Sequence, residues 1–116
     1  MQRQKVVKWL LIAALVFVFG DFGIDKFAHP DLWIGWIPNW MDGLGGLPKQ
    51  SWLQLIGALE VLFALMLLIP IRAIQKAGAI LIVLHLVAVL TQVGWNDVAV
   101  RDIGLMICDI ALIAAL

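Results

Sequence analysis

The sequence predicts an all-α fold, an integral membrane four-helix bundle with a short amphipathic segment in its first outer loop. Of the 116 residues, 64% are hydrophobic and 14% are charged, whereas an average soluble domain has about 45–50% apolar and about 25% charged residues. A soluble chain of this length would leave much of the apolar excess in water, where large apolar patches cause aggregation. A disordered chain needs few apolar residues and many charges, so the composition excludes this class as well. The composition therefore favours the bilayer as the solvent.

Four apolar stretches are long enough to cross a bilayer, which takes about 20 apolar residues in a helix. They form a single transmembrane domain, residues 1–116, with spans at about 6–27, 52–69, 73–93 and 98–116. Pro30 and Pro70 end the first two spans, and Ser51 and Asp97 are the predicted N-caps of the second and fourth. The basic start of the first stretch is also typical of a signal peptide, but no A-x-A site follows, so we expect a retained span.

The single sizeable loop, about residues 29–50, joins the first two spans. Trp33, Trp36 and Trp40 are three and four residues apart, which places them on one face of a helical turn. Because tryptophan prefers the headgroup level of a bilayer, we expect a short amphipathic piece on the outer leaflet. It serves either as an interfacial anchor or as a lid over an outward-facing site.

Basic residues are divided unequally between the two sides of the predicted bundle. One side has Arg3, Lys5, Lys8, Arg72 and Lys76, and the other has Lys26, Lys49 and Arg101. An excess of Lys and Arg marks the cytoplasmic side, so we expect both termini in the cytoplasm. The eight basic and eight acidic residues sum to zero formal charge, and no clustered basic excess indicates binding to nucleic acid.

Ionisable residues inside a span cost about 2.5–3.5 kcal/mol each on insertion scales, so they usually face protein or water. Polar and small residues fall at helical spacing in three spans. They are Gly57, Glu60 and Ala64 in the second span, Gln75, Gly78, His85 and Gln92 in the third, and Asp102 and Asp109 in the fourth. Small residues allow close helix approach, and polar residues hydrogen-bond across it. These stripes predict a compact bundle with a polar interior toward its outer half.

The polar interior supplies the candidate site. We assign Glu60, Arg101 and Asp102 as candidate catalytic residues, because Arg101 offers a positive charge and Glu60 or Asp102 can handle a proton. Asp21, Lys26 and His85 are the candidate cofactor-binding residues. The alternative is purely structural, with each polar contact worth about 0.6 kcal/mol to the bundle.

No metal or thiol chemistry is predicted. A di-iron bundle site needs four carboxylates with two Glu-x-x-His pairs, and Glu60 is the only glutamate. The lone Cys108 lies in an apolar run, so we expect it to be a small buried hydrophobe.

Four short segments, in this order, resemble the DoxX/DoxD-like family of small four-helix membrane proteins. They are GDFGIDKF at 20–27, GALE at 57–60, PIR at 70–72 and RDIGL at 101–105, and together they extend over nearly the whole chain. The resemblance carries over Lys26, Glu60, Arg101 and Asp102 as the matching polar positions. Name-giving members of the family are membrane subunits associated with thiosulfate:quinone oxidoreduction.

The resemblance therefore implies a membrane subunit of a quinone-linked or sulfur/redox oxidoreductase complex rather than a stand-alone enzyme. It also implies a bacterial or archaeal plasma membrane and makes a quinone the candidate cofactor. The expected partners are membrane lipid and other membrane subunits or a second copy of the chain.

Two other functions stay open. The chain could be a purely structural accessory or assembly subunit of a larger membrane complex. It could also be a small proton-coupled dimeric transporter, because small multidrug-resistance transporters share its length, its four spans and a membrane-embedded glutamate. Theirs is in the first span, however, whereas Glu60 is in the second.

Overall fold

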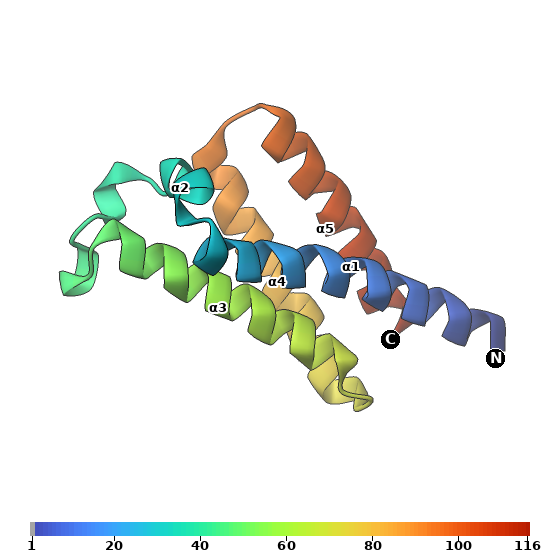
Figure 1. Ribbon diagram of the computed structural model, residues 1–116. Helices are drawn as coiled ribbons and strands as arrows, with labels where there is room; N and C mark the ends of the chain where they lie inside the picture. Colours follow the sequence, from blue (N-terminus) through green and yellow to red (C-terminus); the bar gives the residue numbers. More distant parts are fainter. Residues whose placement is uncertain (1) are drawn as a thin grey trace.

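The computed structural model describes residues 2–116, and most of them are helical (Figure 1). The four long helices are α1 (Gln2–Ala28), α3 (Lys49–Leu68), α4 (Arg72–Val93) and α5 (Asp97–Ala115). Between α1 and α3 lie the one-turn helix α2 (Pro30–Trp33) and the short 3-10 turns η1 (Ile34–Trp36), η2 (Asn39–Met41) and η3 (Leu44–Gly46). Residues 2–116 contain no strand, so the predicted all-α class is confirmed.

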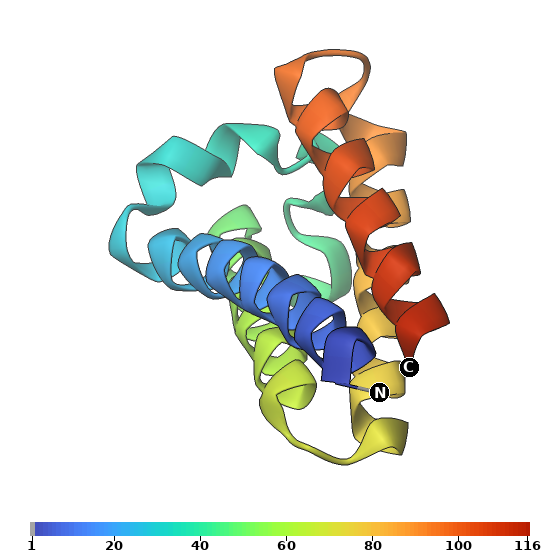
Figure 2. The ribbon, with the colours of Figure 1, turned by 90° about the vertical axis from the view of Figure 1, so that its right-hand side faces the viewer.

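The long helices form a ring in which each contacts two others. Helix α1 packs against α3 and α5, and α4 packs against the same two helices. Their inner faces enclose an apolar core that includes Ile12, Leu15, Phe63, Ile82 and Leu112. Figures 1 and 2 show the chain termini near each other, away from the segment between α1 and α3. We call the end of the bundle that carries this segment the loop end.

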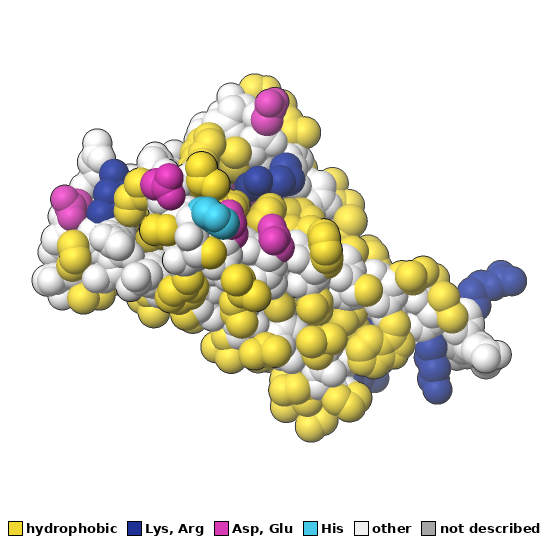
Figure 3. Space-filling view, viewed as in Figure 1, with side chains coloured by type: hydrophobic (Ala, Val, Ile, Leu, Met, Phe, Trp, Pro, Cys, Tyr) yellow, Lys and Arg dark blue, Asp and Glu magenta, His cyan; other side chains and the backbone are white. Residues whose placement is uncertain are grey.

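Three of the long helices, α1, α3 and α4, are long and apolar enough to cross a membrane. Helix α5 differs because Arg101, Asp102 and Asp109 all lie within its 19 residues. Large apolar side chains remain exposed on the outside of the bundle, and hydrophobic side chains cover much of the face in Figure 3. Membrane integration is therefore supported by three apolar helices.

Several helix boundaries differ from the predicted ones. Helix α1 already begins at Gln2, before the apolar stretch, and α3 begins at Lys49. The predictions that Ser51 and Asp97 are N-caps are wrong, because both residues lie inside their helices. The N-cap of α5 is Asn96, whose Oδ1 accepts a hydrogen bond from the Ala99 backbone N–H at 3.1 Å and satisfies one of the free donors of the first turn.

Helices α1 and α3 cross where two glycines face each other. A Cβ on Gly23 would lie 2.6 Å from the backbone oxygen of Gly57, and a Cβ on Gly57 would lie 2.8 Å from the oxygen of Gly23. Only glycine permits this approach of the two backbones, as is typical of helix interfaces in membranes. A second tight approach joins α3 to α4, where a Cβ on Gly78 would lie 2.9 Å from Met66 Cβ.

The glycine crossing gives the first prediction. Gly57→Ala would force α1 and α3 apart, so we expect it to lower the free energy of unfolding by about 1–3 kcal/mol, the usual cost of overpacking. Thermal or denaturant unfolding in detergent micelles measures the change. Gly20→Ala is the matched control, because nothing lies within 4 Å of a Cβ at Gly20. Equal stabilities of the two variants would contradict the role assigned to the crossing.

Candidate functional site

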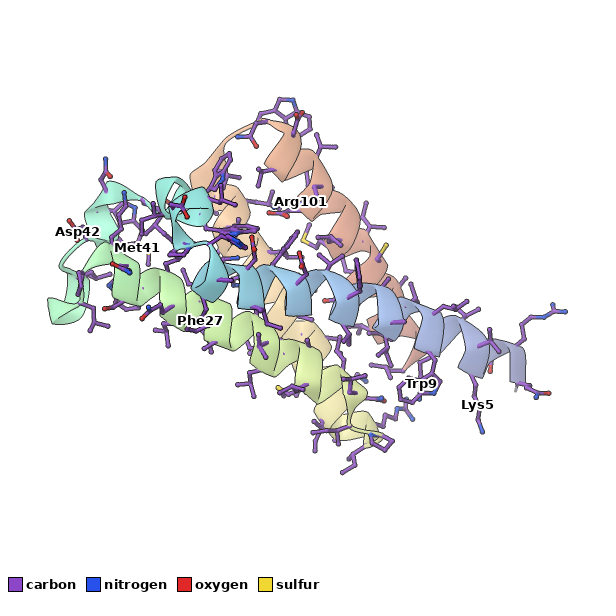
Figure 4. All side chains as sticks on the ribbon, viewed as in Figure 1. Lys5, Trp9, Phe27, Met41, Asp42 and Arg101 are labelled. Carbon is purple, nitrogen blue, oxygen red and sulfur yellow. The ribbon has the colours of Figure 1, made fainter. Side chains whose placement is uncertain are left out.

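A cavity of about 540 Å³ opens at the loop end, between the four long helices and the segment that follows α1. Much of its lining is apolar and includes Leu32, Ile37, Leu53, Ile56, Val89, Val93 and Val98. The charged and polar side chains in its lining are Asp25, Lys26, His85, Thr91, Gln92 and Arg101. Figure 4 labels two of the lining residues, Arg101 on α5 and Met41 in the segment between α1 and α3, which we call the loop. Both lie away from Lys5, which is near the start of α1.

Three tryptophans of the loop also line the cavity: Trp33, Trp36 and Trp40. Trp33 Nε1 donates to Asp25 Oδ2 at 2.6 Å, and Trp40 Nε1 donates to Gln92 Oε1 at 3.1 Å. These bonds fasten the loop to α1 and to α4. The segment between α1 and α3 therefore covers the cavity, which is compatible with the lid hypothesis. Trp36 and Trp40 also keep 45% and 61% of their surface exposed, so the anchor hypothesis is compatible with the same geometry.

A buried ion pair lies next to the cavity. Lys26 Nζ is 2.6 Å from Glu60 Oε1, and the two side chains are only 8% and 4% exposed. The second carboxylate oxygen, Glu60 Oε2, lies 3.3 Å from His85 Nε2, where a protonated ring nitrogen donates to it. Glu60 thus joins a lysine of α1 to a histidine of α4. His85 lies edge-on to Phe19 and Phe63 at 6.3 and 6.1 Å between ring centroids.

Arg101 supplies a second cation to the cavity. Its Nε donates to Asp102 Oδ1 at 3.1 Å, and its guanidinium lies 4.5 Å from the centroid of the Phe22 ring. Arg101 keeps 40% of its side chain exposed, whereas Asp102 is buried behind it. The cation therefore faces the cavity with its counter-charge already in place.

The lysine of the first pair also contacts the loop. Lys26 Nζ lies 3.9 Å from the centroid of the Trp33 ring, a distance at which a cation is attracted to the ring face. Asp25, one position earlier, accepts from Trp33 and lies 2.7 Å from His29 Nδ1. Both lining cations thus have an anionic partner, and the carboxylate of Asp25 is held by two donors.

The predicted site residues are brought together in part. Lys26, His85 and Arg101 line the cavity. Glu60 and Asp102 are buried and hydrogen-bonded or ion-paired to those lining residues. Asp21 is exposed on α1 and does not belong to the cavity lining.

Sequence reasoning missed Asp25 as a member of the site and left the role of the tryptophans open. The spacing of Asp25 and His29, four residues apart at the end of the first span, could have indicated their contact. The expectation that Cys108 is buried is wrong, because Cys108 is exposed on α5 next to the exposed Ile107.

Between residues 2 and 116, no group of three or more His, Cys, Asp or Glu side chains could hold a metal ion. No family model, curated protein or solved structure matches the chain. The resemblance to the DoxX/DoxD-like family therefore stays an expectation based on four short segments.

The buried ion pair gives the second prediction. Glu60→Leu would leave the Lys26 ammonium buried without its anion, so we expect it to lower the free energy of unfolding by about 3–5 kcal/mol. The double variant Lys26→Met, Glu60→Leu should recover most of this loss, because an apolar pair of similar volume often replaces a buried ion pair without net cost. Unfolding of the single and double variants measures their coupling. Additive losses would contradict a direct interaction, and His29→Ala, which breaks an exposed contact, serves as the control with little effect.

Proposed function

We propose that all four long helices cross the bilayer, with the loop end outside and both termini in the cytoplasm. At about 1.5 Å per residue, the 19 residues of α5 reach about 28 Å, close to the thickness of the hydrocarbon layer. No Asp or Glu occurs in residues 1–20 or 61–96, the parts that contain Arg3, Lys5, Lys8, Arg72 and Lys76. Lys and Arg side chains lie around the start of α1 in Figure 3, whereas acidic side chains gather toward the loop end. This separation of charge supports the proposed orientation.

We infer that the cavity at the loop end binds a small amphiphilic molecule of the quinone class. The observation that carries this proposal is the combination of apolar walls with hydrogen-bond donors on Lys26, His85 and Arg101. Ligand sites of small molecules usually have volumes of about 300–1,000 Å³, apolar walls and a few polar groups that fix orientation. A cavity of about 540 Å³ with this lining fits that description.

The balance of charge favours a neutral ligand over an anion. Lys26 is paired with Glu60, and Arg101 is paired with Asp102. An anionic ligand would have to compete with these carboxylates, and it would also meet the carboxylate of Asp25 in the lining. A carbonyl oxygen accepts hydrogen bonds without needing an unpaired cation. The lining therefore fits a carbonyl-bearing ring with an apolar body.

A quinone, when bound, supplies the capacity to take up two electrons with two protons. The chain's own residues bind and orient it and can move protons. His85 both lines the cavity and contacts Glu60 at 3.3 Å, so a proton can pass between the cavity and this buried carboxylate through the histidine. We assign the electron donor to a redox group on a partner subunit, which makes the chain a membrane subunit of a quinone-linked oxidoreductase.

The alternatives explain less of the geometry. A purely structural subunit would not require a covered cavity with donors aimed at it. A proton-coupled transporter needs a carboxylate that exchanges protons with both sides of the membrane, whereas the contact of Glu60 with His85 connects it to the cavity at the loop end. The ligand-binding subunit is therefore the function best supported by the site.

Ligand binding gives the third prediction. A short-chain quinone should quench the fluorescence of the loop tryptophans in a saturable manner in detergent-solubilised protein. Val89→Trp places a bulky ring in the cavity lining and should abolish this saturation, whereas Val87→Trp on the exposed side of α4 should leave it intact. His85→Ala removes a hydrogen-bond donor and should raise the dissociation constant about 3–10-fold. Equal quenching curves for Val89→Trp and Val87→Trp would overturn the assigned site.

Assignment as a subunit gives the fourth prediction. Purification from the native membrane in mild detergent should retain a quinone and a partner protein that contains a redox group. Lipid extraction with chromatography identifies the first, and mass spectrometry identifies the second. Retention of partners without any quinone, together with full complex activity in the Val89→Trp variant, would favour the structural subunit instead.

A further inference from the structure

Asp109 is a buried carboxyl group that the cavity does not use. It lies on α5, is 0% exposed, and does not line the cavity. Neither of its carboxylate oxygens has a hydrogen-bond partner among the described residues, and no ion pair reaches it there. Its neighbours one turn away on α5, Leu105 and Leu112, belong to or pack against the apolar core.

The charged groups of the neighbouring helices α1 and α4 are engaged elsewhere or exposed. Lys26 and His85 contact Glu60, Asp25 contacts His29 and Trp33, and Lys8 Nζ lies 5.1 Å from the centroid of the Trp9 ring. The remaining ones are exposed to the surroundings of the bundle: Arg3, Lys5, Asp21, Arg72 and Lys76. The structure thus offers Asp109 no counter-charge among the described residues of either helix.

We propose that Asp109 is a proton-binding site in the interior of the bundle and holds one proton at neutral pH as an uncharged carboxylic acid. An isolated ionised carboxylate is very costly to bury in an apolar environment, and such a group instead becomes neutral. The ligand of this site is the proton itself. The inference rests on burial and on the lack of a partner, so it does not depend on the ligand proposed for the cavity.

Asp102 provides a comparison, because it shares the helix face of Asp109 but has a charged partner. Asp102 lies seven residues before Asp109, about two helical turns away on the same stripe of α5. Its Oδ1 accepts from Arg101 Nε at 3.1 Å, so a cation lies beside this carboxyl group. The stripe therefore carries one buried carboxyl group with a counter-charge, near the cavity, and one deeper in the core that has none among the described residues.

Infrared spectroscopy of the purified protein in micelles of a detergent without ester groups tests the proposal directly. A protonated carboxylic acid has a carbonyl stretching band that is separate from those of carboxylates and amides. We expect this band in the wild-type protein at neutral pH, and we expect its loss in Asp109→Asn, which keeps the size of the side chain. Asp102→Asn is the matched control and should keep the band, since it removes the buried aspartate that has Arg101 as its partner and leaves Asp109 in place.

The proposal is overturned if the wild-type protein has no protonated-acid band, or if Asp109→Asn retains the wild-type band in full. If Asp109→Asn does not fold, Asp102→Asn protein with ¹³C at the aspartate side-chain carboxyls gives the answer without a substitution at Asp109. The band must then shift to lower frequency, because the remaining buried acids of the described residues are the labelled Asp109 and the unlabelled Glu60. An unshifted band would assign the proton to Glu60 and would also overturn the proposal.

Discussion

The candidate site depends on the close crossing of α1 and α3. Gly23 precedes Lys26 by three residues, and Gly57 precedes Glu60 by the same interval, so each glycine shares a helix face with one member of the ion pair. Because the two backbones approach each other at the glycines, Lys26 Nζ reaches Glu60 Oε1 at 2.6 Å. A wider crossing would leave both charges buried without a partner, which costs far more than the pair contributes.

Both members of this ion pair contact further residues that line the cavity. Glu60 holds His85 on α4, and Lys26 lies against the ring of Trp33 in the loop. Trp33 in turn donates to Asp25, and a separate bond from Trp40 to Gln92 holds the other part of the loop. Polar contacts are stronger where water is excluded, so the loop is positioned by a connected set of side chains as well as by apolar packing.

Helical periodicity predicted which face of each helix points inward, but it could not predict which residues of different helices contact each other. Gly57, Glu60 and Ala64 are buried as expected, and so are Gln75 and Gly78 on α4. The same stripe of α4 is only partly buried at His85 and is exposed at Gln92, toward the loop end. The partner of Lys26 was not predictable, because spacing along one helix says nothing about the rotation or depth of the next. Helix starts were also misplaced, since Asn96 rather than Asp97 makes the cap of α5. Cys108 shows that an apolar run in a helix need not face the core.

Asp102 and Asp109 of α5 show why burial alone does not define a site. Both lie on the inward stripe, and each is at most 3% exposed. Asp102 has an arginine at its side and balances the charge of the cavity, whereas Asp109 has only apolar surroundings and no partner among the described residues. Since the cations of the cavity are paired with Glu60 and Asp102, the ligand that we propose would be selected by the shape of the apolar walls and by the position of the donors. A net positive charge would instead have attracted anions of many shapes.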